Sequence, residues 1–138
     1  MPSLKNTQLT KKILIVEDNI NLIHVVGLTL ELHGYEVIRT TDGKQALNMA
    51  VSQLPDLIMV DLSLPDIDGF AVAGLIRRNP KTHSIPILAA TERKSFKEKE
   101  EYLQSGCDAY ISKPFTPKEL VSRIEKLLLT LGGLSKPA

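Results

Sequence analysis

Short apolar runs rich in β-branched residues alternate along this chain with longer segments of helical periodicity. The runs predict strands at residues 12–16, 36–40, 57–60, 85–90 and 109–112. Apolar residues three and four positions apart predict helices at about 19–33, 70–78 and 96–104, one beginning after Asp42 and one between Thr116 and Gly132. This alternation is typical of βα units built around a parallel sheet. The sequence therefore predicts an α/β domain.

Three helix boundaries carry residues with a physical reason to be there. Asp42 is placed to cap the second helix, and Gly34 follows the first. Thr116 and Glu119 have the spacing of a capping box around Pro117. The helix at 96–104 (FKEKEEYLQ) offers few apolar side chains, so we expect it to be the least firmly held.

The composition narrows the class of protein. The 138 residues are 43% hydrophobic and 24% charged, which is ordinary for one globular domain, and the formal net charge of +1 gives no bulk attraction to nucleic acid or anionic membrane. The single cysteine, Cys107, excludes an internal disulfide and a cysteine-based zinc site. No apolar run has the length of a membrane span, and the polar N-terminus does not resemble a signal peptide. We expect a cytoplasmic domain at residues 11–131 between polar tails at 1–10 and 132–138, with no membrane or direct nucleic-acid partner.

Polar residues follow four of the five predicted strands. They are Glu17 with Asp18, Asp61, Thr91, and Lys113 with Pro114. The carboxyl ends of parallel strands meet at one edge of the sheet, where such folds bind ligands. Three neighbouring carboxylates repel one another unless a cation lies among them, and Mg²⁺ is the cation that prefers such ligands. Singly, each acidic residue could be a solvated loop charge; together with Lys113 they predict a Mg²⁺ and phosphoryl site.

Asp61 is the best candidate for a nucleophile, because it follows the continuously apolar run at 57–60. A carboxylate can accept a phosphoryl group as an aspartyl phosphate. Mg²⁺, Lys113 and Thr91 could then neutralise or bind the phosphoryl oxygens. Lys113 could instead be a surface lysine, and Thr91 alone is a weak signal, since β-branched residues often end strands.

Four motifs carry a family resemblance: ILIVEDN at 13–19, DLSLPDIDG at 61–69, PILAAT at 86–91 and GCDAYISKPF at 106–115. In this order the chain resembles the receiver domain of two-component response regulators over about residues 11–131. The resemblance is to the stand-alone, chemotaxis-receiver type. It implies a flavodoxin-like, doubly wound sheet of five parallel strands in the order 2-1-3-4-5, with five helices.

The resemblance also implies a role for each site residue. Asp61 would accept phosphate from a phosphohistidine on a sensor histidine kinase or phosphotransfer protein. Asp61, Asp18, Glu17 (through water) and the backbone carbonyl of Ser63 would hold Mg²⁺. Thr91 and Lys113 would bind the phosphoryl group, Tyr110 would be the aromatic switch coupled to Thr91, and the Lys113–Pro114 bond would be cis.

The sequence departs from the family pattern after Thr91, where a small residue is usual and this chain has Glu92. A carboxylate there could narrow access and repel an incoming phosphoryl dianion. We expect slow phosphorylation by small donors and a long-lived phosphoryl state. By resemblance, Ser63 and Arg93 flank the path of the hydrolytic water and tune that lifetime.

The expected activity is that of a switch, which assists its own phosphorylation and dephosphorylation without being a classical enzyme. Its output would be a downstream protein contact at the helix 96–104, the strand 109–112 and the last helix, as a monomer or a phosphorylation-dependent dimer. A receiver excised from a larger regulator or hybrid kinase is an alternative. A haloacid-dehalogenase-like phosphatase fits poorly, because it needs a second acid where Ser63 lies and a nucleophile on the first strand. An FMN site fits poorly because the first loop, EDNIN, is acidic.

Overall fold

The computed structural model describes residues 10–64, 68–92 and 106–132. The predicted helix at 96–104 and the tuning residue Arg93 lie outside these ranges. So do nearly all of the two predicted tails.

Five parallel strands form one sheet in the order β2-β1-β3-β4-β5. The strands are β1 (Lys12–Val16), β2 (Glu36–Thr40), β3 (Leu57–Asp61), β4 (Ile87–Thr91) and β5 (Ala109–Ser112). This confirms the flavodoxin-like topology that the resemblance implied. Three predicted strands have the predicted bounds, whereas the fourth begins two residues later than predicted. Its predicted start contained Pro86, which has no N–H to donate to a sheet ladder.

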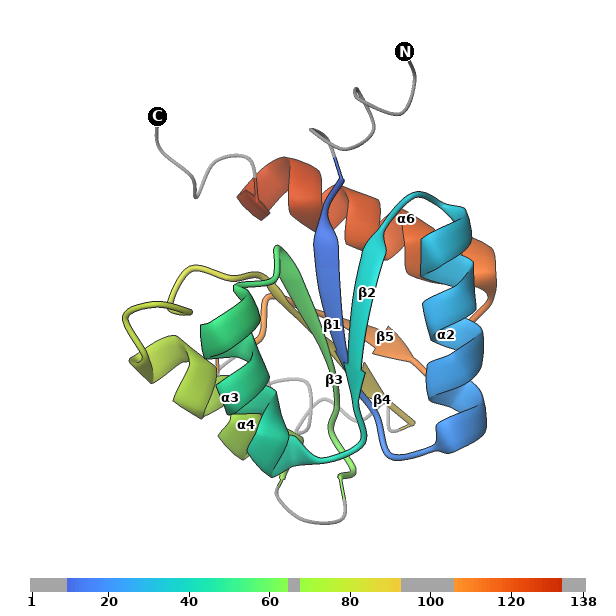
Figure 1. The fold of residues 1–138 in the computed structure, drawn as a ribbon. Helices are drawn as coiled ribbons and strands as arrows, with labels where there is room; N and C mark the ends of the chain where they lie inside the picture. Colours follow the sequence, from blue (N-terminus) through green and yellow to red (C-terminus); the bar gives the residue numbers. More distant parts are fainter. Residues whose placement is uncertain (1–9, 65–67, 93–105, 133–138) are drawn as a thin grey trace.

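Helices cover both faces of the sheet (Figure 1). Helices α3 (Gly43–Gln53) and α4 (Gly69–Arg78) lie on one face, and α2 (Ile20–Leu32) and α6 (Pro117–Leu127) lie on the other. A short π-helical turn, Leu128–Gly132, follows α6. Within the described residues there are thus four α-helices, and the fifth predicted helix falls outside them. No helix in these ranges is long and apolar enough to cross a membrane.

Alternating strand residues divide the core into two clusters. Leu14, Ile58 and Ile87 pack towards α3 and α4, while Ile13, Leu57 and Leu88 pack towards α2 and α6. Every residue of β3 and β4 is buried, as expected for strands covered on both faces. Burial of each such aliphatic side chain contributes roughly 1.5–3 kcal/mol, so this core fixes the positions of the strand ends.

Each described helix begins at a side-chain cap. Asn19 accepts a hydrogen bond from Leu22 N at 3.0 Å, Asp42 from Lys44 N at 2.7 Å and Asp68 from Phe70 N at 2.9 Å. Thr116 and Glu119 form the predicted capping box at the start of α6. Because three of these caps follow the carboxyl end of a strand closely, they also fix the loops that surround the site.

Candidate functional site

Four neighbouring strands deliver the predicted site residues to one edge of the sheet, the lower edge in Figure 1. Glu17 follows β1, Asp61 ends β3, Thr91 ends β4, and Lys113 follows β5. In the ladder, Asp61 lies opposite Ala90, so Thr91 is one residue beyond the partner of Asp61. The backbone N–H of Lys113 donates to the Thr91 carbonyl at 2.8 Å, which ties the fourth cluster to the third.

Three carboxylates meet at this edge. One oxygen of each of Glu17, Asp18 and Asp61 lies within 4.8 Å of the others. Glu17 and Asp61 are only 3% exposed, whereas Asp18 is exposed to solvent. The cluster therefore has two buried members and one member open to arriving ions and ligands.

Lys113 enters the cluster from the side of β5. Its Nζ lies 2.8 Å from Glu17 Oε1 and 3.4 Å from Asp61 Oδ1, and its side chain is 13% exposed. The Lys113–Pro114 peptide bond is cis, which confirms the prediction. Three carboxylates against one ammonium leave two negative charges in excess when all four groups are ionised.

Burial and pairing shift two pKa values in the cluster. Burial raises the pKa of the Glu17 carboxyl, and the negative charge of Asp61 adds to the rise, although the hydrogen bonds from Lys113 and Asn19 oppose it. For Lys113, burial disfavours the charged ammonium, but the hydrogen bond to Glu17 and the charges of Glu17 and Asp61 outweigh it, so the pKa of Lys113 is raised. The ammonium is thus held in its charged form beside Asp61.

Backbone groups orient the two buried carboxylates. The N–H of Ser63 donates to Asp61 Oδ1 at 3.0 Å, and the N–H of Asn19 donates to Glu17 Oε2 at 3.1 Å. The first residue of α4, Gly69, lies so close to Asp61 that a Cβ atom there would stand 2.5 Å from the Asp61 carbonyl oxygen. Any larger residue would force the start of α4 away from the strand end that carries Asp61.

The oxygen cluster fits a magnesium ion. Carboxylate oxygens are the hard ligands that Mg²⁺ prefers, and two ligands on opposite sides of the ion lie about 4.2 Å apart. Oxygens within 4.8 Å can reach such an ion with small movements or through one bridging water. The excess negative charge of the buried pair gives the cation a direct electrostatic reason to bind there.

The sequence of this chain is similar to that of a known protein family. Residues 13–125 match the response regulator receiver domain. The chain belongs to the response regulator receiver family. Receiver domains of this kind act in two-component systems, and they are phosphoacceptors rather than classical enzymes.

The receiver domain has relatives of two lengths. It is 39% identical over 117 residues to the DNA-binding dual master transcriptional regulator RpaA of Synechocystis, covering 85% of this chain and 48% of RpaA. It is 36% identical over 120 residues to the polar-differentiation response regulator DivK of Brucella ovis, covering 87% of this chain and 98% of DivK. The chain thus spans about half the length of the first relative and nearly all of the second.

A solved receiver domain shares the fold and contains a metal. The receiver domain of the sensor histidine kinase PA1611 from Pseudomonas aeruginosa has a magnesium ion coordinated in its active-site cleft. Its TM-score to this receiver is 0.78 at 34% identity, covering 90% of this chain and 98% of that one.

The remaining predicted residues lie on β4 and β5 and in the loops that follow β3 and β4. Thr91 is buried, and Ser63 and Glu92 are exposed. Glu92 and Lys113 both line a groove of about 640 Å³ that opens beside the site. Tyr110 is half-buried on β5.

Sequence reasoning missed three contributors to the receiver site. It did not anticipate the hydrogen bond from the Asn19 backbone to Glu17, the close approach of Gly69 to Asp61, or the contact of Arg123 with Tyr110. Gly69 was visible as the end of the DLSLPDIDG motif. The Asn19–Glu17 hydrogen bond joins residues only two positions apart but depends on the conformation of the loop after β1. The Arg123–Tyr110 contact joins two different elements, so it leaves no local pattern.

Proposed function

We propose that this receiver accepts a phosphoryl group on Asp61 in a Mg²⁺-dependent reaction and thereby switches a protein-binding surface. The observation that carries the proposal is the buried cluster itself: Asp61 lies between other carboxylates and the Lys113 ammonium, 3.4 Å away, at the open edge of the sheet. A buried carboxylate with this excess of negative charge is costly unless a cation neutralises it. A cation bound there could also hold a phosphoryl group beside Asp61.

The transfer conserves atoms and charge in one displacement. An Asp61 carboxylate oxygen forms a bond to phosphorus while the P–N bond of a protonated phosphohistidine breaks. The donor leaves as neutral imidazole, and Asp61 becomes an aspartyl phosphate. Hydrolysis resets the switch: a water oxygen attacks phosphorus, the bond between phosphorus and the Asp61 oxygen breaks, and inorganic phosphate leaves.

Several residues of the chain would position Asp61 and the phosphoryl group. Lys113, whose Nζ lies 3.4 Å from Asp61 Oδ1, would supply positive charge to one phosphoryl oxygen, and Thr91 would donate its hydroxyl to another. The Ser63 N–H holds Asp61 Oδ1 in place. Asp18, Asp61 and the Ser63 carbonyl would hold Mg²⁺, with Glu17 acting through water, and the ion would supply positive charge to the transferred group.

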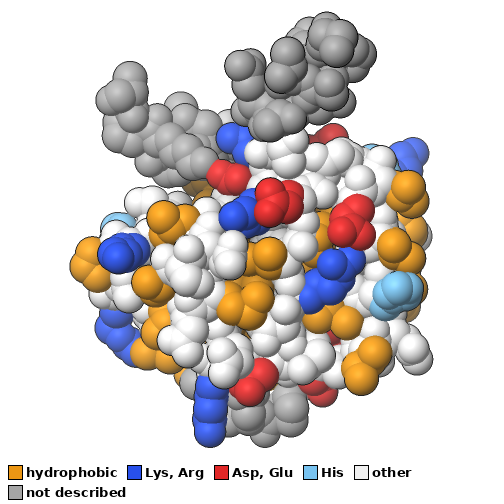
Figure 2. Space-filling model, in the orientation of Figure 1, with side chains coloured by type: hydrophobic (Ala, Val, Ile, Leu, Met, Phe, Trp, Pro, Cys, Tyr) orange, Lys and Arg blue, Asp and Glu red, His pale blue; other side chains and the backbone are white. Residues whose placement is uncertain are grey.

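The surface beside the groove suits a large phosphodonor. Helix α2 exposes four aliphatic side chains although its other face is buried: Ile20 is 73% exposed, Val25 54%, Leu28 46% and Leu32 86%. Figure 2 shows hydrophobic side chains along this side of the molecule. Val25 and Leu22 also line the groove, together with Phe115. A sensor histidine kinase or phosphotransfer protein that covers this face would bring its phosphohistidine to Asp61.

Phosphorylation of Asp61 would change the conformation of the receiver as far as β5. Thr91 would move towards the phosphoryl oxygen, and the Tyr110 ring would follow, changing the surface near β5 and α6. A downstream protein would bind that changed surface. The receiver would act in the cytoplasm as a monomer or as a phosphorylation-dependent dimer, and it would make no direct contact with nucleic acid. DivK and RpaA are precedents for the same domain alone and within a longer regulator.

Intact mass spectrometry after incubation with acetyl phosphate tests the proposal. The expected result is a single phosphoryl adduct that requires Mg²⁺ and is absent from Asp61→Asn. Asp68→Asn is a matched control, because Asp68 is an exposed helix cap on the same loop. An adduct that forms equally without Mg²⁺, or that persists in Asp61→Asn, would overturn the proposal.

A further inference from the structure

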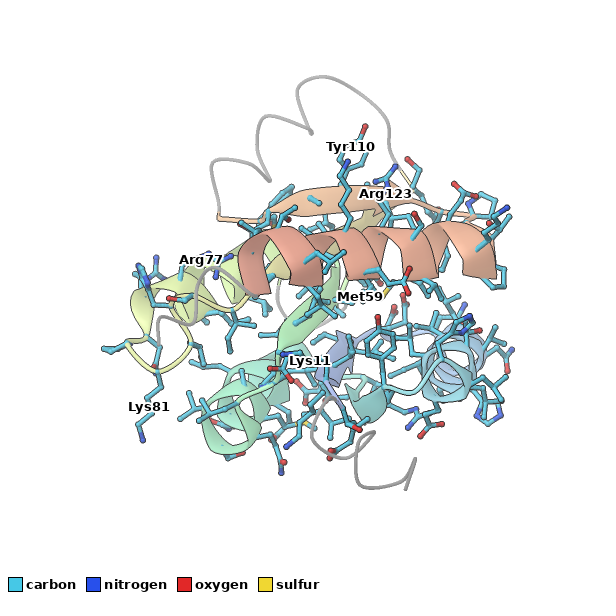
Figure 3. The ribbon with its side chains drawn as sticks, turned by 90° about the horizontal axis from the view of Figure 1, so that it is seen from above. Lys11, Met59, Arg77, Lys81, Tyr110 and Arg123 are labelled. Atoms are coloured by element: carbon cyan, nitrogen blue, oxygen red, sulfur yellow. The ribbon has the colours of Figure 1, made fainter. Side chains whose placement is uncertain are left out.

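Tyr110 and Arg123 make a cation–π contact beside β5, the outermost strand of the sheet. Strand β5 is the last strand in the order, so its outer side has no neighbouring strand among the described residues. Arg123 extends from α6 to this edge, and Figure 3 shows its side chain beside that of Tyr110, which projects past β5. The guanidinium carbon lies 5.9 Å from the centre of the Tyr110 ring.

Arg123 is bound to the same residue at a second point. Its Nη1 donates a hydrogen bond to the backbone carbonyl oxygen of Tyr110. That bond anchors the guanidinium to the strand whichever way the Tyr110 side chain turns. The ring–cation contact, in contrast, exists only while the ring stays at the edge of β5.

We propose that Arg123 is a positioning residue that holds the Tyr110 ring at the edge of β5 before phosphorylation, and so sets how readily phosphorylation moves it. The effect on switching rests on the proposed function, in which Tyr110 moves when Asp61 is phosphorylated. A contact made in only one of two conformations shifts the equilibrium between them by its own interaction free energy. Loss of this contact therefore favours the moved ring, and a phosphoryl analogue should act at lower concentration.

The expected size of the effect on the Tyr110 equilibrium follows from how exposed the two side chains are. Arg123 is exposed and Tyr110 half-buried, and cation–π contacts at exposed sites change an equilibrium by about two- to fivefold. Arg123→Gln keeps a side-chain donor for the Tyr110 carbonyl but removes the cation. Arg123→Lys keeps the cation but loses the planar group that lies against the ring, so it should fall between the wild type and Arg123→Gln.

Fluorine NMR of protein labelled with 3-fluorotyrosine measures the ring directly. The chain has three tyrosines, Tyr35, Tyr102 and Tyr110, and Tyr110→Phe assigns the resonance of interest. Without any analogue, the Tyr110 resonance of Arg123→Gln should shift towards its position in the analogue-bound wild type. With beryllofluoride and Mg²⁺, its titration midpoint should fall about two- to fivefold. Lys126→Gln, which removes another exposed cation from α6, should match the wild type in both measurements.

The outcomes separate this inference from the proposed function. A Tyr110 resonance and a midpoint that are unchanged in Arg123→Gln would overturn the positioning role, even if the variant unfolds at a lower temperature. A wild type that does not respond to beryllofluoride and Mg²⁺ would overturn the proposed function, and with it the effect on switching. In that case the comparison made without the analogue still decides whether Arg123 positions the ring: a Tyr110 resonance that differs between the wild type and Arg123→Gln supports the role, and an unchanged one overturns it.

Discussion

The two edges of this sheet use acidic residues in opposite ways. At the edge where the strands begin, Asp56 accepts a hydrogen bond from Lys12 N and Asp108 accepts one from Ile87 N, both at 2.8 Å. At the edge where the strands end, Glu17, Asp18 and Asp61 crowd together around a single ammonium. The first arrangement satisfies each carboxylate inside the fold. The second leaves negative charge for a ligand to neutralise, so the partners of a carboxylate, more than its residue type, separate a structural role from a functional one.

Mg²⁺ should give the largest change in the free energy of unfolding, and it should do so by binding only at the edge where the strands end. An ion that binds the folded chain alone stabilises it by about 2.7 kcal/mol at a concentration one hundred times its dissociation constant. Thermal unfolding with and without Mg²⁺ measures this stabilisation. Asp18→Asn should lose most of it at the same Mg²⁺ concentration, and Asp56→Asn should keep it. Equal losses in the two variants would show that the carboxylate cluster is not the binding site.

The edge where the strands begin should be sensitive to loss of Arg77 instead. Arg77 donates to the carbonyl oxygens of Gly106, His83 and Ile85 at 2.9, 3.0 and 2.6 Å, and to Asp108 Oδ2 at 2.5 Å. The bonds to Gly106 and Ile85 are partly buried, so Arg77→Ala leaves two partly buried acceptors without that donor and should lower the free energy of unfolding by roughly 2 kcal/mol. Denaturant unfolding measures the loss. The affinity for Mg²⁺, followed by calorimetry, should stay unchanged if the two edges are independent.

Matched Asp→Asn substitutions should change stability with opposite signs at the two edges. Without Mg²⁺, Asp61→Asn removes a like charge from the cluster and should raise the free energy of unfolding by about 1 kcal/mol. Asp56→Asn weakens a charge-assisted hydrogen bond to Lys12 N and should lower it by about 1 kcal/mol. Urea unfolding in EDTA compares the two. The account fails here if both variants are destabilised alike.

Glu92 adds one more negative charge beside the groove, and it should slow the approach of small phosphodonors. A like charge in a partly solvated site costs about 1 kcal/mol, which corresponds to roughly a fivefold change in rate. Glu92→Ala should therefore speed phosphorylation by acetyl phosphate about fivefold and also speed loss of the phosphoryl group. Intrinsic fluorescence is of little use without tryptophan, so the time course is followed by intact mass. Unchanged rates would remove Glu92 from the list of tuning residues.

The smallest predicted effect concerns Tyr35, which lines a groove of about 480 Å³ with Lys11, His33 and Glu125 at the opposite end of the molecule. Burial raises the pKa of Tyr35, and the charge of Glu125 adds to the rise. Above the unfolded-state pKa of about 10, the unfolded chain loses this proton before the folded one, so stability should fall as the pH rises from about 10 to the higher pKa of the folded chain. Glu125→Gln should bring the tyrosine titration, read by absorbance near 295 nm against Tyr35→Phe, back towards the ordinary range. A tyrosine titration that is the same in Glu125→Gln as in the wild type would exclude Glu125 as a cause of the raised pKa.

Local signals explain what the sequence predicted well. The strands at 12–16, 36–40 and 109–112 were predicted with the observed bounds, and the caps at Asp42 and Thr116 act as predicted. Strand-end residues could be grouped at one edge because all parallel strands point the same way. The strand order itself came from the family resemblance, since hydrophobic periodicity does not say which strands are neighbours.

Long-range pairing explains what the sequence did not predict. Arg77 meets Asp108 across 31 positions of the chain, and Lys113 meets Glu17 across 96. The sequence placed Lys113 near the carboxylates but did not predict that its shorter contact is with Glu17 and its longer one with Asp61. Such choices among partners depend on side-chain packing in the folded chain.

Reductive mapping of the phosphorylated residue tests the central claim most directly. Borohydride reduces an aspartyl phosphate to homoserine, so peptide mass mapping after incubation with acetyl phosphate and Mg²⁺ identifies the acceptor. The account predicts homoserine at position 61 alone, with Asp18, Asp56 and Asp108 unchanged in the same sample. Homoserine at one of those positions, or a phosphoryl adduct that yields none at position 61, would contradict it.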